Sequence, residues 1–345
     1  MTSPALSVLD LVPVRSDQTT GDALAASISL AQTADEVGMR RYWVAEHHNM
    51  PAVGATNPPV LIAMIAAATE RIRVGSGGVM LPNHAPMVVA EQFALLEAAH
   101  PGRIDLGIGR APGSDQVTSF MLRGGNSDEE VARFPRYVEE VMTMMSPDGA
   151  GIDLRGQVYE LRATPKAVSA PPVWLLGSSD YSARLAGGLG LPYVFAHHFA
   201  GRGTAEALDL YRSTFRPSGH AERPTTFLTV NLIVAQTEDE AWRLAMPNQQ
   251  SMLALRTGQP LHPQRLVEEA EAVALDERQR GFVDALSADW VIGTPDQAAK
   301  QITALAQEFD VDEVMLHPIA GAHEGTRADR SPAREQSLRL LAEAL

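Results

Sequence analysis

Residues 71–110 read RIRVGSGGVMLPNHAPMVVAEQFALLEAAHPGRIDLGIGR. Short apolar runs at the two ends of this stretch, over residues 71–80 and 103–109, predict strands, and residues 86–99 between them predict a helix. A strand, a helix and a second strand in succession are typical of parallel strands joined by a crossover connection. The prediction of the fold class starts from this unit.

The same alternation extends in both directions along the chain. Six more strands are predicted, over residues 6–12, 41–45, 172–176, 193–196, 226–235 and 313–316. Further helices are predicted over residues 22–37, 58–69, 131–145, 182–189, 204–215, 296–309 and 331–345. Eight parallel strands are enough to close a barrel, so the expected fold is α/β, a TIM (β/α)8 barrel.

An open, doubly wound sheet is the competing architecture, and it would place a glycine-rich turn directly after the first strand. Residues 12–17, VPVRSD, contain no glycine. Two stretches, residues 111–173 and 237–290, interrupt the alternation of strands and helices. The second is mostly helical and charged, and it is interpreted as a helical insertion between strands seven and eight, over one rim of the barrel. The chain, 1–345, is expected to form a single domain.

The composition excludes several classes of function. The chain has 345 residues, a formal net charge of −14 and no cysteine. The lack of cysteine excludes disulfides, thiolate metal sites and cysteine nucleophiles. A chain this acidic is a poor candidate for binding nucleic acid or an anionic membrane. The N-terminus does not resemble a signal peptide, and no window reaches the roughly 18–20 apolar residues of a membrane span. A cytoplasmic protein without nucleic-acid or membrane partners is therefore expected.

Polar or glycine-rich clusters follow most of the predicted strands. They are Glu46-His47-His48-Asn49, residues 75–78, 107–110 and 177–179, His197-His198 and His317-Pro318. In a TIM barrel the carboxyl ends of the strands meet on the face that carries the active site. Each cluster alone has an ordinary structural explanation, such as a hydrogen-bonded histidine pair, a turn, a helix cap or a surface ion pair of Arg110. Their shared position at the strand ends favours one functional site.

These residue types suit a flat, anionic ligand and a proton transfer. Gly177-Ser178-Ser179 precedes a predicted helix, whose backbone N–H groups, hydroxyls and positive dipole end can bind a phosphate. Arg110, after the neighbouring strand, can clamp the same phosphate with its planar guanidinium. Gly77-Gly78 lets a flat ligand approach the backbone closely. His47 titrates near neutral pH and suits proton transfer, and Glu46 can orient an imidazole or contact a ligand ring.

Several segments, in this order, resemble the bacterial luciferase-like flavin monooxygenases, in a branch without known light emission. They are SVLDLVP at 7–13, YWVAEHH at 42–48, RIRVGSGGVMLP at 71–82, AEQF at 90–93, PGRIDLGIGR at 101–110, LLGSS at 175–179, GLPYVFAHH at 190–198 and GTP at 293–295. The resemblance covers nearly the whole chain and is weakest over residues 237–290. It implies a TIM barrel with an insertion after strand seven.

The resemblance also implies a cofactor and partners. Members of the family typically bind reduced FMN, which a separate NAD(P)H:flavin reductase supplies, and react it with O2. Oxygen adds at flavin C4a, and the resulting peroxide oxidises an aldehyde or another small organic substrate. The family habit is a homodimer. The substrate of this chain stays open, because one sequence does not define the shape of the substrate pocket.

Roles carried over from the family fall on the clusters described above. Glu46 matches a flavin-contacting carboxylate, and His47 matches the catalytic histidine. Gly77-Gly78 matches a non-proline cis peptide bond. Arg110 and Ser178 match phosphate ligands.

The neighbouring positions belong to the same expected cofactor site but depart from the luciferase pattern. Ser179 follows Ser178, whereas Gly177 stands where luciferases have a carboxylate and His197 where they have an aromatic residue. Gly109 replaces a cysteine that lies beside the flavin. These departures argue against light emission and against specificity for long-chain aldehydes.

Three other functions remain open at this point. The first is an oxidoreductase that uses the deazaflavin F420 on the same barrel and transfers hydride without oxygen. The second, a metallohydrolase, would need ligands spaced as His-x-His on a strand or His-x-x-x-His on a helix; neither occurs, and no metal site is expected. The third is a flavin-binding protein without turnover, against which the intact Glu46-His47 pair argues.

Overall fold

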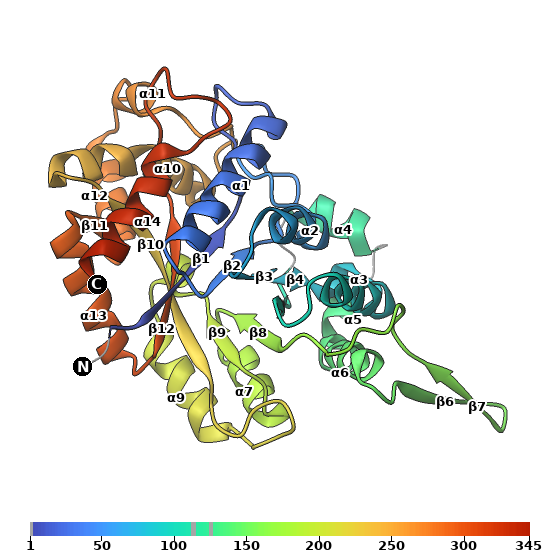
Figure 1. Cartoon of the computed structure of the whole chain (residues 1–345). Coiled ribbons are helices and arrows are strands. Elements are labelled where there is room, and N and C mark those ends of the chain that lie inside the picture. Colours follow the sequence, from blue (N-terminus) through green and yellow to red (C-terminus); the bar gives the residue numbers. More distant parts are fainter. Residues whose placement is uncertain (1–2, 112–114, 124–126) are drawn as a thin grey trace.

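Parallel strands form a closed barrel at the centre of the molecule, and helices surround it (Figure 1). The computed structural model describes residues 3–111, 115–123 and 127–345. The barrel strands are β1 (Ala5–Asp10), β2 (Arg41–Val44), β3 (Arg73–Ser76), β4 (Val79–Met80), β5 (Ile104–Gly109), β8 (Val173–Gly177), β9 (Tyr193–Phe195), β10 (Thr226–Val234) and β12 (Glu313–Pro318). Neighbouring strands are parallel throughout, and β12 pairs with β1, which closes the barrel. The predicted TIM barrel is confirmed.

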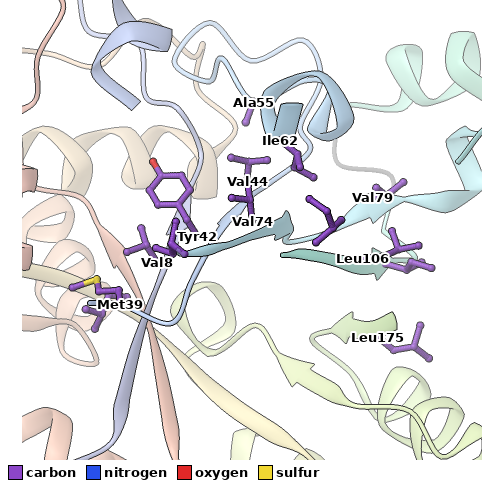
Figure 2. Packing of buried hydrophobic residues seen from close by; sticks show 14 of the residues in the cluster. Val8, Met39, Tyr42, Val44, Ala55, Ile62, Val74, Val79, Leu106 and Leu175 are labelled. Carbon is purple, nitrogen blue, oxygen red and sulfur yellow. The ribbon is translucent and has the colours of Figure 1, made fainter. Parts of the chain in front are cut away.

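Helices run along the outside of the barrel between successive strands. They are α1 (Thr20–Glu36), α2 (Pro58–Ala68), α3 (Pro86–Ala99), α6 (Phe134–Met145), α7 (Asp180–Leu189), α9 (Thr204–Thr214), α13 (Pro295–Glu308) and α14 (Pro332–Ala344). Their ends carry the expected signals: Thr19 and Asp22 form a capping box before α1, and Gly190 ends α7 in the left-handed conformation with a φ of 64°. Figure 2 shows the packing between the two layers, with Val44 and Val74 of the barrel facing Ile62 of α2.

The third predicted strand, over residues 71–80, is interrupted in the structure. β3 ends at Ser76, the Gly77–Gly78 peptide bond is cis, and β4 resumes at Val79. Both segments pair with β5, so they share one position in the barrel. The cis bond is the one that the resemblance implied.

Side chains fill the barrel interior in layers, as is usual for this fold. At the amino ends of the strands, Arg41 bonds to Asp105 at 3.0 Å and to Glu313 at 2.7 Å, and Arg73 also contacts Asp105. These buried charges are therefore paired. The next layer is apolar and consists of Leu9, Trp43, Trp174, Val194, Phe227 and Met315. These two layers fill the barrel near the amino ends of its strands. A ligand therefore has access only from the carboxyl ends of the strands.

The expected helical insertion lies between β10 and β12. It consists of α10 (Glu238–Thr257), α11 (Val267–Glu271) and α12 (Glu277–Ser287), which Figure 1 shows grouped together, and of β11 (Val291–Gly293), which pairs with β10. Its apolar residues, with the end of β10 and the segment after β12, form a small cluster that includes Leu244, Val267, Trp290 and Ile319. Strand β11 was not predicted, because three residues are too few to show a period.

The stretch of residues 111–173 contains a hairpin that the sequence analysis did not predict. After α4 (Gln116–Arg123), α5 (Ser127–Ala132) and α6, strands β6 (Ala150–Leu154) and β7 (Gln157–Leu161) pair antiparallel and extend away from the barrel (Figure 1). Most of their described residues are exposed on both faces, so no alternation of apolar and polar residues marks the strands. No helix in the described ranges is long and apolar enough to cross a membrane.

A histidine ties the insertion to the segment that follows β12. His323 Nδ1 lies 2.6 Å from Glu268 of α11, and its Nε2 lies 2.7 Å from Glu240 of α10. Burial alone would lower the pKa of His323, but the hydrogen bonds and charges of Glu240 and Glu268 outweigh it, so the pKa is raised. Both ring nitrogens face carboxylates, which favours the doubly protonated ring.

This contact predicts a pH-dependent stability. A raised folded-state pKa means that the contribution of His323 is full below about 6.5, the ordinary value in an unfolded chain, and is lost as the pH rises through the folded-state pKa. We expect the difference in melting temperature between the wild type and His323→Gln to be larger at about pH 5.5 than at about pH 9. A difference that stays constant over this range would contradict the assignment.

Candidate active site

The carboxyl ends of neighbouring strands bring most of the predicted site residues to one mouth of the barrel. Gly109 of β5 lies opposite Leu176 of β8, and Gly177 of β8 lies opposite Phe195 of β9. Arg110, Ser178 and His198 therefore follow three adjacent strands. On the other side of the mouth, Asn231 of β10 lies opposite His317 of β12.

Glu46 is a buried anion that holds its surroundings in place. It is 1% exposed, and its Oε1 accepts hydrogen bonds from His48 Nε2 at 2.8 Å and from His84 Nε2 at 2.7 Å. Its Oε2 accepts the backbone N–H of Met80 at 2.9 Å, two residues after the cis bond. Burial alone would raise the pKa of Glu46, but the hydrogen bonds from His48 and His84 lower it to about 2. An ionised carboxylate only accepts, so both imidazoles carry a proton on Nε2.

His47 is the histidine of this segment with an unsatisfied nitrogen. Its backbone N–H donates to Ala55, but the side-chain Nδ1 is buried and has no hydrogen-bond partner within the described ranges. Burial lowers the pKa of His47, and the charge of Glu46 opposes this without reversing it. The imidazole is therefore neutral near pH 7, and such a ring can both donate and accept a proton.

Two further histidines of the mouth, His198 and His317, belong to the strand-end clusters of the sequence but were given no individual role. The ring of His198 stands edge-on to that of His317, with 5.6 Å between centroids. Asn231 donates its amide N–H to the carbonyl of His198 at 2.8 Å, so its Oδ1 faces His317 Nδ1 at 2.9 Å. Because an amide oxygen only accepts, His317 carries its proton on Nδ1 and leaves Nε2 as an acceptor. Burial lowers the pKa of both histidines, to about 3 for His198, so both are neutral.

His197 does not join these residues. Its ring packs against Phe309, which follows α13, and its Nδ1 bonds to Thr204 Oγ1 at 2.7 Å at the start of α9. His197 and His198 open the short helix α8 (His197–Ala200), in which successive side chains are rotated by about 100°, so the two rings have different surroundings. His198, not His197, stands against His317 in the mouth, and no periodic signal in the sequence distinguishes the two, because the strand ends before them at Phe195.

Arg110 and the two serines, the expected phosphate cradle, lie beside the mouth. The guanidinium carbon of Arg110 lies 4.1 Å from the centroid of Tyr181, and no described carboxylate lies within 4.0 Å of it. Ser178 and Ser179 are exposed just before α7, and Ser179 makes no capping hydrogen bond. The surface ion pair that would have explained Arg110 structurally is not present among the described residues. Asp180 is the acidic residue in the first turn of α7, and its negative charge would repel an anion bound there.

The glycines of the site differ in what they accommodate. An added Cβ would lie 2.8 Å from Leu9 Cδ1 at Gly77, 2.8 Å from the carbonyl oxygen of Gly107 at Gly78 and 2.1 Å from Ser182 Oγ at Gly177. At Gly78 the backbone of β5 therefore leaves no room for a side chain, whereas at Gly77 and Gly177 the side chains of Leu9 and Ser182 would have to move. At Gly109 the nearest atom would be 3.9 Å away, so this glycine borders open space at the mouth.

Comparisons with known proteins assign the family. The model of the luciferase-like monooxygenase family matches residues 5–313. The chain belongs to this family. A luciferase-like monooxygenase of Escherichia coli strain K12 is 40% identical over 313 residues, which cover 91% of each chain. The N-acetyl-S-alkylcysteine monooxygenase of Bacillus subtilis strain 168 is 32% identical over 322 residues, 92% of this chain and 94% of the relative.

Solved structures share the fold, and those that share it bind different cofactors. Apo-MsnO8 is 33% identical, with a TM-score of 0.83 over 99% of this chain and 97% of its own. Two structures share the fold alone: the oxygenating constituent of 3,6-diketocamphane monooxygenase of Pseudomonas putida in complex with FMN (19% identical, TM-score 0.71) and an F420-dependent secondary alcohol dehydrogenase (13%, 0.63). Each likeness covers 99% of this chain, together with 97% of the camphane monooxygenase chain and 99% of the dehydrogenase chain. The fold therefore does not decide between the cofactors.

The site also bears on the alternative of a metallohydrolase. Among the described residues, no group of three histidine, aspartate or glutamate side chains lies close enough together to hold a metal ion. The chain is thus placed among monooxygenases by its family and its relatives. Its cofactor and substrate have to be inferred from the site.

Proposed function

We propose that the enzyme is an FMN-dependent monooxygenase, which uses reduced FMN and O2 to oxidise a small organic substrate. The observation that carries this proposal is the guanidinium of Arg110, which lies on the ring of Tyr181 without a described acidic partner. It follows the strand next to the one that presents Ser178 and Ser179 at the start of α7. A phosphate suits this set of donors, and their attraction has to exceed the repulsion from Asp180.

The remaining residues of the mouth receive roles from their contacts. Bound FMN would supply the electrons and the atom that reacts with O2. Gly109 would leave space for the flavin ring, and His47 would hold or move the proton that the oxidation requires. Glu46 would act as a positioning residue, because its carboxylate is already occupied by His48, His84 and the N–H of Met80. His197 has no direct role in this proposal, because its ring packs against Phe309 and its Nδ1 is bonded to Thr204.

A separate flavin reductase belongs to the proposal. We expect the purified enzyme to be nearly colourless and to oxidise NADH or NADPH slowly unless a reductase is added, because no strand is followed by Gly-x-Gly-x-x-Gly. A structural neighbour is likewise named an oxygenating constituent. Anaerobic spectra of the protein with free FMN and NADH test this. Rapid flavin reduction by the protein alone would contradict it.

A homodimer is the proposed assembly. Apolar side chains on the outer faces of α2 and α3 are exposed, with Val60 and Leu95 each 56% accessible to solvent. An uncovered apolar face of this kind is typical of an interface between protein chains. We expect Val60→Glu combined with Leu95→Glu to yield a monomer in light scattering, while Val168→Glu, at another exposed apolar position, leaves the wild-type dimer intact. A monomeric wild type or an unaffected double variant would contradict this interface.

A further inference from the structure

A cavity of about 300 Å³ lies beside the barrel mouth, beneath the helical insertion. Its walls come from α8 (His197–Ala200), from the loop that follows α8 and from α10 and α12 of the insertion. The volume is at the lower end of the range that protein pockets for small molecules occupy. Arg110, Ser178 and Ser179 do not line it. The cavity is therefore separate from the proposed phosphate cradle.

Two arginines give the cavity its charge. The guanidinium carbon of Arg256 lies 4.0 Å from the centroid of the Phe199 ring, and Arg202 lines the same cavity from the loop after α8. Neither has a described carboxylate within 4.0 Å, although the chain carries a net charge of −14. Asp289 is the acidic group of the wall, and its Oδ2 would lie 2.7 Å from a Cβ on Gly201. Two cations and one anion leave the cavity a net positive charge.

The rest of the wall is mainly apolar. Phe199 and Phe282 are 45% and 40% exposed, and Met252 and Trp290 complete this side. Exposed aromatic side chains in a hollow are surfaces that an apolar ligand group can cover. His197 also lines the cavity: it is 6% exposed, and its Nε2 has no hydrogen-bond partner within the described ranges. The wall thus suits a ligand with an apolar body and an anionic group.

The cavity adjoins the site where the oxidation is proposed to occur. His198 lines it and also stands edge-on to His317 in the barrel mouth. We propose that this cavity binds the organic substrate and that the substrate is a small carboxylate with an apolar body, its anionic group held by Arg202 and Arg256. That the bound molecule is oxidised rests on the proposed function, whereas the binding of its anionic group does not.

The test compares an acid with its neutral amide. Calorimetry with the full chain, without added flavin, measures binding of 4-phenylbutyrate and of 4-phenylbutanamide. We expect the acid to bind about tenfold more tightly than the amide, and Arg202→Gln or Arg256→Gln to weaken only the acid by about five- to tenfold, less than for a buried charge-assisted hydrogen bond because both arginines are exposed to solvent. Asp289→Asn should strengthen binding of the acid. Arg278→Gln, which removes an exposed arginine from α12 outside the cavity, should change neither.

The result that would reject the anion site differs from the result that would reject FMN as the cofactor. Equal affinities for the acid and the amide, or arginine variants that bind the acid as the wild type does, reject an anion site. A folding defect is separable, because Asp289→Asn is expected to act in the opposite direction at an unchanged melting temperature. A third outcome is that FMN and 4-phenylbutyrate compete, and that FMN affinity falls in Arg256→Gln but not in Arg110→Ala. This outcome would assign the cavity to the cofactor phosphate and reject the proposal. Failure of FMN to bind leaves the acid and amide comparison intact.

Discussion

Replacing His47 by glutamine is expected to slow the reaction of the bound reduced flavin with O2 and substrate by about 10²–10⁴-fold, the usual contribution of general acid–base catalysis. The imidazole is neutral because burial lowers its pKa, and its Nδ1 has no partner in the described structure. Glutamine preserves polarity and approximate size but does not exchange a proton near neutral pH. Stopped-flow absorbance of the reduced flavin after mixing with oxygen measures the effect.

A purely structural role of His47 predicts a different pattern. The variant would then lose melting temperature and FMN affinity together, while the oxygen reaction of the flavin that still binds would keep its wild-type rate. His262→Gln is the matched control, because His262 is exposed and lies outside the barrel mouth. A folded His47→Gln protein with a wild-type oxygen reaction would reject the proton-transfer role.

Arg110→Ala is expected to weaken FMN by about 10- to 150-fold, because a charge-assisted hydrogen bond contributes about 1.5–3 kcal/mol. Riboflavin lacks the phosphate, so its dissociation constant should remain nearly unchanged. Arg110→Lys should recover only part of the loss, because an ammonium does not reproduce the planar guanidinium or its stacking on Tyr181. Fluorescence titration with both flavins gives the two dissociation constants for each variant.

The control for this series is Arg184→Ala. Arg184 is an exposed arginine of α7, the helix that also carries Tyr181, and its replacement removes the same charge from the same region. FMN affinity should change little in this variant. Equal losses for FMN and riboflavin in Arg110→Ala would show that the arginine supports the fold of the mouth and does not bind the phosphate.

The barrel could be predicted because its signals are local. Apolar runs of four to nine residues recur at regular intervals. Helix ends are marked by caps such as Thr19 and by glycines such as Gly190. The interruption at Gly77–Gly78 was expected from the resemblance and not from periodicity, because apolar residues continue on both sides of the glycines. The exposed hairpin of β6 and β7 could not be predicted either, since neither of its faces is consistently buried.

The site was predicted in part. Chain order placed Glu46, His47, Arg110 and Ser178 at the mouth, because each follows the end of a strand within three residues. His84 was missed because it reaches Glu46 from a loop 38 positions further along the chain. Asn231 was missed because it lies inside β10 and its interior position depends on the closed barrel. For Gly77 and Gly78, access for a flat ligand stays a prediction, and the structure adds that a Cβ at either position would crowd Leu9 or the backbone of Gly107.

The central claim is that this barrel uses reduced FMN and oxygen. The most direct test titrates the protein anaerobically with reduced FMN and, in parallel, with reduced F420, and then mixes each complex with oxygen. The account predicts that reduced FMN binds, that Arg110→Ala weakens this binding, and that the bound flavin reacts with O2 at a rate that depends on His47. Tight binding of F420 with no reaction towards oxygen, together with weak binding of FMN, would contradict it and assign the barrel to hydride transfer.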